Sequence, residues 1–418
     1  MGKFSGYRCS ICGKEYDHSY SGYVCTADGG NLNVVLDYDA IRKAYKPQDI
    51  FASQESSLWR YEPLLPVNDP GFEGTPLHSA GWTPVYRLDK LAEKVGVNSL
   101  WVKDEGRNPT ASFKDRASAI LIARAKEINA PTIVTASTGN AGAALAGMAA
   151  ASGWHAIIFA PKSAPPAKIS QLLVFGAEVI LVDGNYDSAF DLSVAAAEKY
   201  GWYCRNTGYN AFTVEGKKTG AFEIWEQVIA KSLKDTDKPL NVFISVGDGN
   251  IISGIHKGFI DLFELGWLPR MPRIFGVQSE KSAAVYQAWA KNSEEIIPVH
   301  ATTFADSISV DLPRDGVRAV RAATQTGGAY LAVPDEIIYS GISELGKYGI
   351  FAEPAGATAY VGMQKAVESG LIGADDDVLV VNTGSGLKDI RSAMVATGEA
   401  AVIEPTMDAL TKYLENRK

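Results

Sequence analysis

One lysine occupies a position where its usual charged form is disfavoured. In residues 105–120, EGRNPTASFKDRASAI, an Asn-Pro-Thr turn precedes Ser112, and Asp115 three residues later predicts a capping box at the start of a helix. Lys114 would then lie in the first helical turn, where the helix dipole disfavours an ammonium group. Because the same field lowers the pKa of the amine, the position suits a lysine that acts uncharged or forms an imine.

Three polar loops that contain glycine follow apolar segments with the composition of buried strands. They are STGNAG at 137–142, VGDGNIISG at 246–254 and NTGSGLKD at 382–389. In open α/β sheets, such loops lie where ligands bind, and they can present backbone N–H groups and a helix N-terminus to an anion. The middle loop lacks the Gly-Lys-Ser/Thr ending of a nucleotide-binding loop. Together with a lysine that can form an imine, the loops indicate a pyridoxal phosphate site.

The elements that must position these loops alternate from about residue 100 onward. Helix-length segments such as AKISQLLVFG and DSAFDLSVAAAEKYG lie between most of the apolar ones. The predicted strands are TIVTAS, HAIIFAP, AEVILVD, NVFISVG, RIFGVQ and VLVVNTG. Strands this apolar are expected in a parallel sheet that helices cover on both faces. We predict an α/β fold.

Composition favours a cytoplasmic protein with neither a nucleic-acid nor a membrane partner. The chain of 418 residues has a net charge of −8 and a pI near 5.3, which disfavours a basic surface for phosphate backbones. Four cysteines are too few for a disulfide scaffold, and the N-terminus has no apolar secretory signal. The uncharged segment 128–161 is interrupted by Ser, Thr, Asn and Gly, unlike a membrane span.

Seven motifs together resemble those of the threonine synthases, which belong to the fold-type II pyridoxal-phosphate enzymes of the tryptophan synthase β-like group. In the family's order, they are GWTPVYRL, NPTASFKDR, STGNAGAA, VEGKKT, VGDGNIISG, GIFAEPAGAT and NTGSGLKD. The resemblance implies a lyase of threonine biosynthesis that converts O-phospho-L-homoserine and water to L-threonine and phosphate. It implies pyridoxal 5'-phosphate as the cofactor and a small amino-acid substrate. We also expect a homodimer.

The resemblance assigns roles to residues at matching positions. It implies Lys114 as the catalytic Schiff-base lysine, Asn140 as the partner of the pyridine 3-hydroxyl, and Thr383 as a neutral hydroxyl facing the pyridine nitrogen. The implied cofactor-binding residues are Lys114, Phe113, Asn140, Gly247, Asp248, Gly249, Asn250, Ile251 and Thr383. The substrate carboxylate is expected at Ser137, Thr138 and Gly139. Glu353 is interpreted as a cap or a structural hydrogen-bond partner, outside the catalytic set.

Three positions depart from the family pattern. Thr213 stands where the bacterial members have an arginine for the substrate phosphate, and Ala111 replaces a glycine. The carboxylate of Asp248, in a shortened cofactor loop, would repel that phosphate unless it is protonated or paired. The candidates for compensating charge are Lys217, Lys218 and Arg205.

Four parts of the chain are expected, with the cofactor between two α/β domains. They are a zinc-ribbon-like module at 1–48, a large α/β domain formed by 49–99 and 211–400, a small α/β domain at 100–210, and a C-terminal helix at 401–418. Cys9, Cys12 and Cys25 begin like a zinc ribbon, but Asp28 stands at the fourth position. We assign no metal ligand, because a degenerate knuckle that folds by packing alone is favoured over bound zinc.

Two other functions stay open. A β-eliminating or β-replacing pyridoxal-phosphate enzyme could act on serine, threonine or a phosphorylated amino acid. A non-catalytic binding protein could instead use its cysteine module to contact a partner. The lysine and the three loops argue against the binding protein, and the substrate distinguishes the two enzymes.

Overall fold

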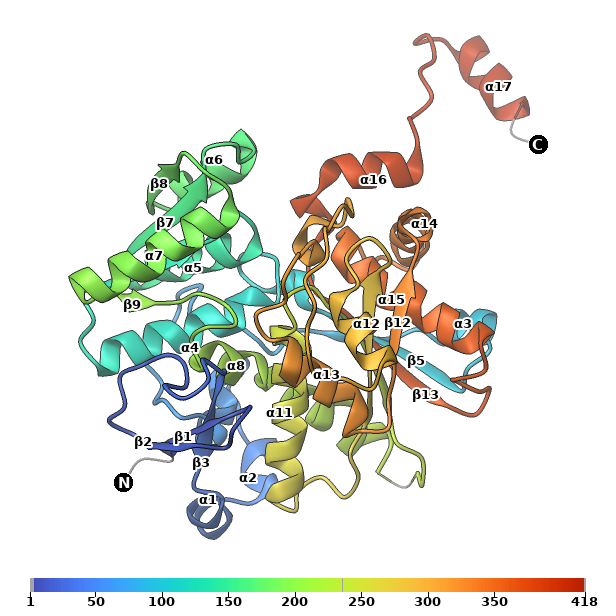
Figure 1. Cartoon of the computed structure of the whole chain (residues 1–418). Coiled ribbons are helices and arrows are strands. Elements are labelled where there is room, and N and C mark those ends of the chain that lie inside the picture. The colour runs from blue at the N-terminus through green and yellow to red at the C-terminus, as the bar shows by residue number, and fades with distance from the viewer. Residues whose placement is uncertain (1–3, 235, 417–418) are drawn as a thin grey trace.

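The computed structural model describes residues 4–234 and 236–416 of the chain. Figure 1 shows two α/β lobes side by side, with the N-terminal segment (blue) below them in this view. One lobe is built on a four-stranded sheet and the other on a six-stranded sheet. The prediction of an α/β class with parallel-sheet domains and a small β-rich N-terminal module is confirmed.

The four-stranded sheet carries the first of the predicted loops. Its strands are β6 (Thr132–Ala136), β7 (His155–Pro161), β8 (Glu178–Val182) and β9 (Tyr203–Cys204), and its helices are α4 (Lys114–Glu127), α5 (Asn140–Ser152), α6 (Pro166–Val174) and α7 (Tyr186–Tyr200). The strands are parallel in the order β8-β7-β6-β9. Successive residues of β6 face opposite sides, so that Ile133 packs in one hydrophobic cluster and Val134 in another. Helices therefore cover both faces of this sheet.

The six-stranded sheet carries the other two loops. Its strands are β4 (Val85–Arg87), β5 (Ser99–Asp104), β10 (Asn241–Ser245), β11 (Arg273–Ser279), β12 (Tyr330–Val333) and β13 (Asp377–Asn382), in the order β12-β11-β10-β13-β5-β4. Only β4 pairs antiparallel among these strands. The two-sided pattern recurs in β10, where Val242 and Phe243 belong to different hydrophobic clusters.

Helices of this lobe surround the sheet and continue to the C-terminal end of the described chain. They are α3 (Asp89–Val95), α8 (Phe212–Lys217), α9 (Thr219–Ile224), a π-helical turn η3 (Trp225–Ile229), α10 (Ala230–Ser232), α11 (Asn250–Glu264), α12 (Ala284–Ala290), α13 (Gly316–Thr324), α14 (Asp335–Gly346), α15 (Pro354–Glu368), α16 (Ile390–Thr397) and α17 (Met407–Glu415). Helix α17 stands away from the body of the molecule (Figure 1) and corresponds to the predicted C-terminal helix, whose last two residues lie outside the described part. None of the described helices is long and apolar enough to cross a bilayer.

The N-terminal module is an antiparallel sheet followed by short helices. It contains β1 (Phe4–Cys9), β2 (Glu15–Asp17), β3 (Leu32–Leu36), α1 (Tyr38–Ala44) and α2 (Pro47–Phe51), and the 3-10 helix η1 (Leu58–Leu64) follows. The strand order is β2-β1-β3. Further 3-10 turns are η2 (Glu105–Arg107), η4 (Asp306–Ile308) and η5 (Gly386–Lys388).

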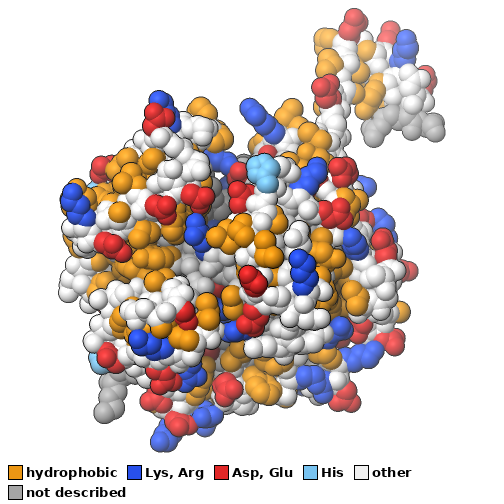
Figure 2. Space-filling model, viewed as in Figure 1, with side chains coloured by type: hydrophobic (Ala, Val, Ile, Leu, Met, Phe, Trp, Pro, Cys, Tyr) orange, Lys and Arg blue, Asp and Glu red, His pale blue; other side chains and the backbone are white. Residues whose placement is uncertain are grey.

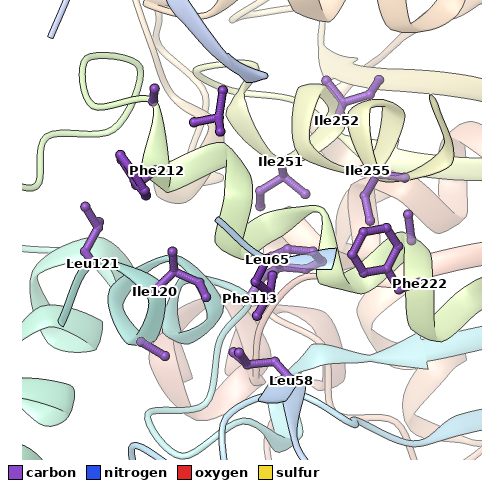
Figure 3. Close-up of a cluster of buried hydrophobic side chains, with 14 of the residues drawn as sticks. Leu58, Leu65, Phe113, Ile120, Leu121, Phe212, Phe222, Ile251, Ile252 and Ile255 are labelled. Atoms are coloured by element: carbon purple, nitrogen blue, oxygen red, sulfur yellow. The ribbon is translucent and has the colours of Figure 1, made fainter. Parts of the chain in front are cut away.

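A hydrophobic centre joins the helix that begins with Lys114 to the helix that follows the glycine loop. Figure 3 shows side chains from α4, α8, α9 and α11 converging with Leu58 and Leu65 of the lead-in segment. Phe113, next to Lys114, is 1% exposed and packs in this cluster, as does Ile251 of α11. Close packing of this kind holds both helix starts in place.

Buried ion pairs also fix the position of α4. The guanidinium of Arg116 contacts Glu105 at 2.7 Å and Glu223 at 2.8 Å, and Lys103 contacts Glu223 at 2.7 Å. All four side chains are buried. Because each buried charge has an opposite partner, the network sets the orientation of α4 relative to β5 and α9.

Candidate active site

The segment before Lys114 pairs with the loop that follows β13. The N–H of Phe113 donates to the carbonyl of Thr383 at 2.9 Å, and the N–H of Ser385 donates to the carbonyl of Ala111 at 3.0 Å. Between these bonds, Ser112 and Gly384 form an antiparallel bridge. The lysine and the third predicted loop are therefore neighbours, although they are far apart in sequence.

Lys114 is the first residue of α4, so its predicted place in the first helical turn is confirmed. The predicted capping box between Ser112 and Asp115 is wrong. The carboxylate of Asp115 accepts instead from the N–H of Thr110 at 2.6 Å and from its hydroxyl. Phe113 precedes the helix and supplies no side-chain cap. The turn before the helix folds back on Asp115, which removes that carboxylate from the helix start.

The amine of Lys114 lies among charged side chains. The loss of solvent around it, followed by the positive charge of Arg205, lowers the pKa of Lys114 to about 8, while Glu353 and Asp248 act in the opposite direction. Arg205 is buried, and one of its guanidinium nitrogens has no hydrogen-bond partner among the described residues. The surroundings therefore shift Lys114 toward its uncharged form, through burial and Arg205 rather than through the helix field on which the sequence prediction was based.

Asn140 and Glu353 join the first predicted loop to the third. Asn140, at the start of α5, donates from Nδ2 to both carboxylate oxygens of Glu353, at 3.1 and 3.0 Å, and to the hydroxyl of Ser307 at 3.3 Å. The N–H of Glu353 donates to the carbonyl of Gly384 at 3.0 Å. Burial raises the pKa of Glu353. Its interpretation as a hydrogen-bond partner agrees with these contacts, whereas no sequence motif pointed to Ser307.

The two glycines of the middle loop leave no room for side chains. Gly249 precedes α11 with φ +90°, and a Cβ there would lie 2.7 Å from the carbonyl oxygen of Asp315. A Cβ on Gly247 would lie 2.7 Å from the Cα of Ile308. The first N–H groups of a helix have no intrahelical acceptors, so the start of α11 has N–H groups that are available to an anion.

Hydrogen bonds to neighbouring segments fix the side chains of the same loop. Asn250 accepts from Lys217 Nζ at 2.5 Å and donates to the carboxylate of Asp315 at 2.7 Å. Asp248 accepts from the N–H of Arg314 at 2.7 Å. Burial, together with the charge of Asp315, raises the pKa of Asp248 to about 6, against the lowering effect of that N–H and of Lys217.

The predicted substrate loop borders solvent. Ser137, Thr138 and Gly139 follow β6 and are partly exposed, and a Cβ built on Gly139 would meet nothing within 4 Å. Figure 2 shows a hollow between the two lobes on the face drawn there. This loop is the open side of the candidate site, whereas the loop at Gly249 is its tightly packed side.

The arrangement fits pyridoxal phosphate. An amine with a lowered pKa can form an imine with an aldehyde. The helix start after Gly249 offers N–H groups to a phosphate, and a side chain at Gly249 would collide with Asp315 and displace this helix start. Asn140 and Thr383 supply polar groups on the elements that meet Lys114.

Replacing Gly249 by valine is expected to weaken the binding of pyridoxal phosphate about tenfold or more. A branched side chain at φ +90° costs about 1–3 kcal/mol in backbone strain, besides the clash with Asp315. Titration of the apoprotein, followed by cofactor absorption, measures this change. Gly266→Val is the matched control, because Gly266 also has a positive φ but has nothing within 4 Å. Equal losses in the two variants would contradict the role of the loop.

The chain matches known proteins over most of its length. The family model for pyridoxal-phosphate dependent enzymes matches residues 77–384. The chain is 36% identical over 411 residues to a threonine synthase from Methanocaldococcus jannaschii, with 98% of this chain and 99% of that protein covered. It is 34% identical over 411 residues to a threonine synthase from Methanosarcina acetivorans, with 97% and 98% covered.

Solved structures share the fold at lower identity. Diaminopropionate ammonia lyase from Escherichia coli matches with a TM-score of 0.65 and 24% identity, over 76% of this chain and 87% of that chain. Threonine deaminase isoform 2 from Solanum lycopersicum matches with a TM-score of 0.64 and 22% identity, over 77% and 88%.

Proposed function

Because the chain belongs to the pyridoxal-phosphate-dependent enzymes, we propose that its site performs the threonine synthase reaction, which converts O-phospho-L-homoserine and water to L-threonine and phosphate. The observation that carries this function is the likeness to threonine synthases over 97–98% of the chain, a span that contains the segments with the lysine and the three loops. The chain is therefore a lyase of amino-acid biosynthesis.

Different residues of the site would bind different parts of the cofactor. Pyridoxal phosphate, when bound, withdraws electrons from the substrate carbons next to the amino group. Lys114 would bind the cofactor covalently and then move protons at the substrate Cα. Asn140, held by Glu353, would orient the ring, and Thr383 would place a neutral hydroxyl at the pyridine nitrogen. The backbone from Gly247 to Ile251 would bind the cofactor phosphate.

The substrate would span the open and the tightly packed sides of the site. Ser137, Thr138 and Gly139 would bind its carboxylate through hydroxyl and backbone donors. The substrate phosphate requires cations, and Thr213 is neutral. The Thr213 hydroxyl is also already engaged, because it donates to the carbonyl of Asn210 at 2.7 Å.

Of the three candidate cations, two interact electrostatically with Lys114. Lys218 is already neutralised by Glu215 at 2.6 Å and by Asp261 at 2.8 Å. Lys217 contacts Asn250 of the cofactor loop, and the charges of Lys114 and Arg205, after burial, lower its pKa. We therefore assign the substrate phosphate to Arg205, which has an unpaired guanidinium nitrogen among the described residues.

Replacing Asp248 by asparagine is expected to lower the KM for O-phosphohomoserine. A unit charge about 10 Å from the phosphate costs about 1–2 kcal/mol, or roughly tenfold in affinity, at a surface-like dielectric. The amide oxygen can still accept from the N–H of Arg314. Because the pKa of Asp248 is about 6, the difference should be largest above pH 6 and vanish below it, where the wild-type carboxyl is protonated. A KM that is the same in both proteins from pH 5 to 8 would contradict a carboxylate that faces the phosphate.

A substrate panel tests the function directly. The holoenzyme should release phosphate from O-phosphohomoserine and form threonine, with little keto acid from serine or threonine. The reverse pattern would favour the β-eliminating or β-replacing alternative. A preparation that neither absorbs as a lysine-bound cofactor nor takes up reduced cofactor with borohydride would exclude both enzymes.

The oligomeric state, the cellular location and the limits of the two domains are also part of the proposal. We propose a cytoplasmic homodimer, for which light scattering would give twice the chain mass of 44.8 kDa. The small domain would extend to residue 210 and the large one from 211 to 400. The predicted start of the small domain, at residue 100, divides β5, which pairs with β13 from Ser99 to Asp104. We therefore place that start after residue 104.

A further inference from the structure

Four potential metal ligands meet in the N-terminal module. The sulfur atoms of Cys9, Cys12 and Cys25 and a carboxylate oxygen of Asp28 all lie within 4.8 Å of one another. They come from two turns, one after β1 and one before β3. The proposed reaction uses none of these residues, and the cluster lies outside the site that contains Lys114.

The spacing of these atoms is close to that of a tetrahedral zinc site. Bonds of about 2.3 Å to sulfur and about 2.0–2.2 Å to oxygen place tetrahedral ligands roughly 3.4–3.8 Å apart. Cys9 Sγ lies 3.4 Å from Asp28 Oδ1, and Cys12 Sγ lies 3.6 Å from Cys25 Sγ. These two pairs already have the separation of tetrahedral ligands, and all four atoms lie within 4.8 Å, so a small inward shift would complete the tetrahedron.

The two turns have similar backbone structures, which explains why Asp28 can replace a cysteine as the fourth ligand. In the first, Cys9-x-x-Cys12, the N–H of Gly13 donates to the carbonyl of Cys9 at 3.2 Å. In the second, Cys25-x-x-Asp28, the N–H of Gly29 donates to the carbonyl of Cys25 at 2.9 Å. The two glycines have φ of +74° and +71°. Asp28 therefore occupies the position that corresponds to Cys12 in the first turn.

Backbone donors also orient the ligand atoms. The N–H of Ile11 points to Cys9 Sγ at 3.3 Å, and the N–H of Ala27 points to Cys25 Sγ at 3.4 Å. The N–H of Gly30 holds Asp28 Oδ1 at 2.8 Å. Such donors stabilise thiolate and carboxylate ligands and fix their direction, which is the usual role of groups behind a metal site.

We propose that Cys9, Cys12, Cys25 and Asp28 bind one Zn²⁺ ion at a structural site. Four protein ligands fill the tetrahedron and leave no position for a substrate. Binding would release the three thiol protons to solvent, and the resulting site would carry a net charge of −2. A disulfide between Cys12 and Cys25 is the competing state, and it would leave the Cys9 thiol bonded to Asp28 and to a backbone N–H group.

The metal site would stabilise the loop that binds the cofactor phosphate. Arg321 of α13 donates to the carbonyl of Ser10, between two proposed ligands. Arg318 of the same helix donates to Asn33 of β3 at 2.9 Å and pairs with Asp315 at 2.5 Å. Asp315 in turn accepts from Asn250 at 2.7 Å. Loss of the metal is therefore expected to weaken cofactor binding without removing any residue that touches the cofactor.

Metal analysis of the full chain, purified without a metal-affinity tag, tests the proposal. About one zinc per chain is expected in the wild type, and background levels in Cys9→Ser and Asp28→Ala. Cys204→Ser, at a buried cysteine outside the cluster, should keep the metal. Asp28→Cys should also keep it, because a fourth thiolate completes the same tetrahedron.

Cobalt spectroscopy of the wild type gives an answer that does not depend on whether a variant folds. Co²⁺ added to the reduced apoprotein should give tetrahedral d–d bands and a thiolate charge-transfer band, and the latter should grow by about a third in Asp28→Cys, from three thiolates to four. Three results would overturn the proposal: no tetrahedral spectrum in the wild type, unchanged zinc in Cys9→Ser and Asp28→Ala, or a Cys12–Cys25 disulfide in metal-free protein that does not take up zinc after reduction.

Discussion

Replacing Lys114 by alanine is expected to leave a folded chain that has lost turnover by several orders of magnitude. The side chain lies in the first turn of α4 and is only partly buried, so its truncation leaves the hydrophobic centre intact. Removing a covalent catalyst abolishes the route that it provides. The variant should also lose the visible absorption of the lysine-bound cofactor, measured at saturating pyridoxal phosphate.

Lys90→Ala is the matched control for this experiment. Lys90 lies in the first turn of α3 and is exposed, so its loss should change neither absorption nor turnover. Thermal unfolding would confirm that both variants fold. Wild-type turnover in Lys114→Ala would refute the assignment of this lysine.

The lowered pKa of Lys114 gives a pH test on the wild type. Only the uncharged amine attacks an aldehyde, and its pKa is about 8. The rate at which the apoenzyme binds pyridoxal phosphate covalently should therefore rise with pH up to about 8 and level off above it. A rise that continues to pH 10 would indicate an ordinary lysine.

Replacing Arg205 by methionine is expected to lower kcat/KM for O-phosphohomoserine by two to three orders of magnitude. At about 4 Å and a surface-like dielectric, a guanidinium and a phosphate charge attract by about 4 kcal/mol, which is roughly a thousandfold in affinity. Methionine retains an apolar chain in a buried position. The loss should fall mainly on KM, and inorganic phosphate should become a weaker competitive inhibitor.

Arg273→Met is the control for Arg205→Met. Arg273 lies on β11, where its guanidinium donates to the carbonyl of Gly327 at 3.0 Å. Its replacement should change neither KM nor phosphate inhibition. If Arg205→Met kept the wild-type KM, or if it lost cofactor absorption together with activity, then Arg205 would not be the anchor of the substrate phosphate.

The sequence predicted those parts of the fold that depend on local pattern. Six apolar segments became β6, β7, β8, β10, β11 and β13, because buried parallel strands are apolar on both faces. The strands β4, β5, β9 and β12 were not among the predicted ones. Three of them have two to four residues, too few for a pattern to show, and the six-residue β5 ends in the charged pair Lys103 and Asp104. The Asn-Pro-Thr segment correctly predicted that Lys114 lies at the start of a helix, although the predicted capping box between Ser112 and Asp115 was wrong.

The contacts between distant segments could not be predicted. Ser307 reaches Asn140 across the two lobes, and Asp315 reaches Asn250 within the large lobe, where α13 packs against α11. The three cationic candidates were equivalent in sequence. The pairing of Lys218 with Asp261 on α11 distinguishes them, and that pairing depends on how α8 packs against α11.

The pairing of residues 111–113 with residues 383–385 has a mechanical consequence. It makes the segment that carries Lys114 an extra strand-like edge of the large lobe, although α4 continues into the small one. If the small lobe rotates, the lysine can stay aligned with Thr383 while Ser137 and Gly139 travel with β6. If Ser137 and Gly139 bind the substrate carboxylate as proposed, that binding would draw the small lobe toward the large one, while the amine of Lys114 stays near the axis of rotation.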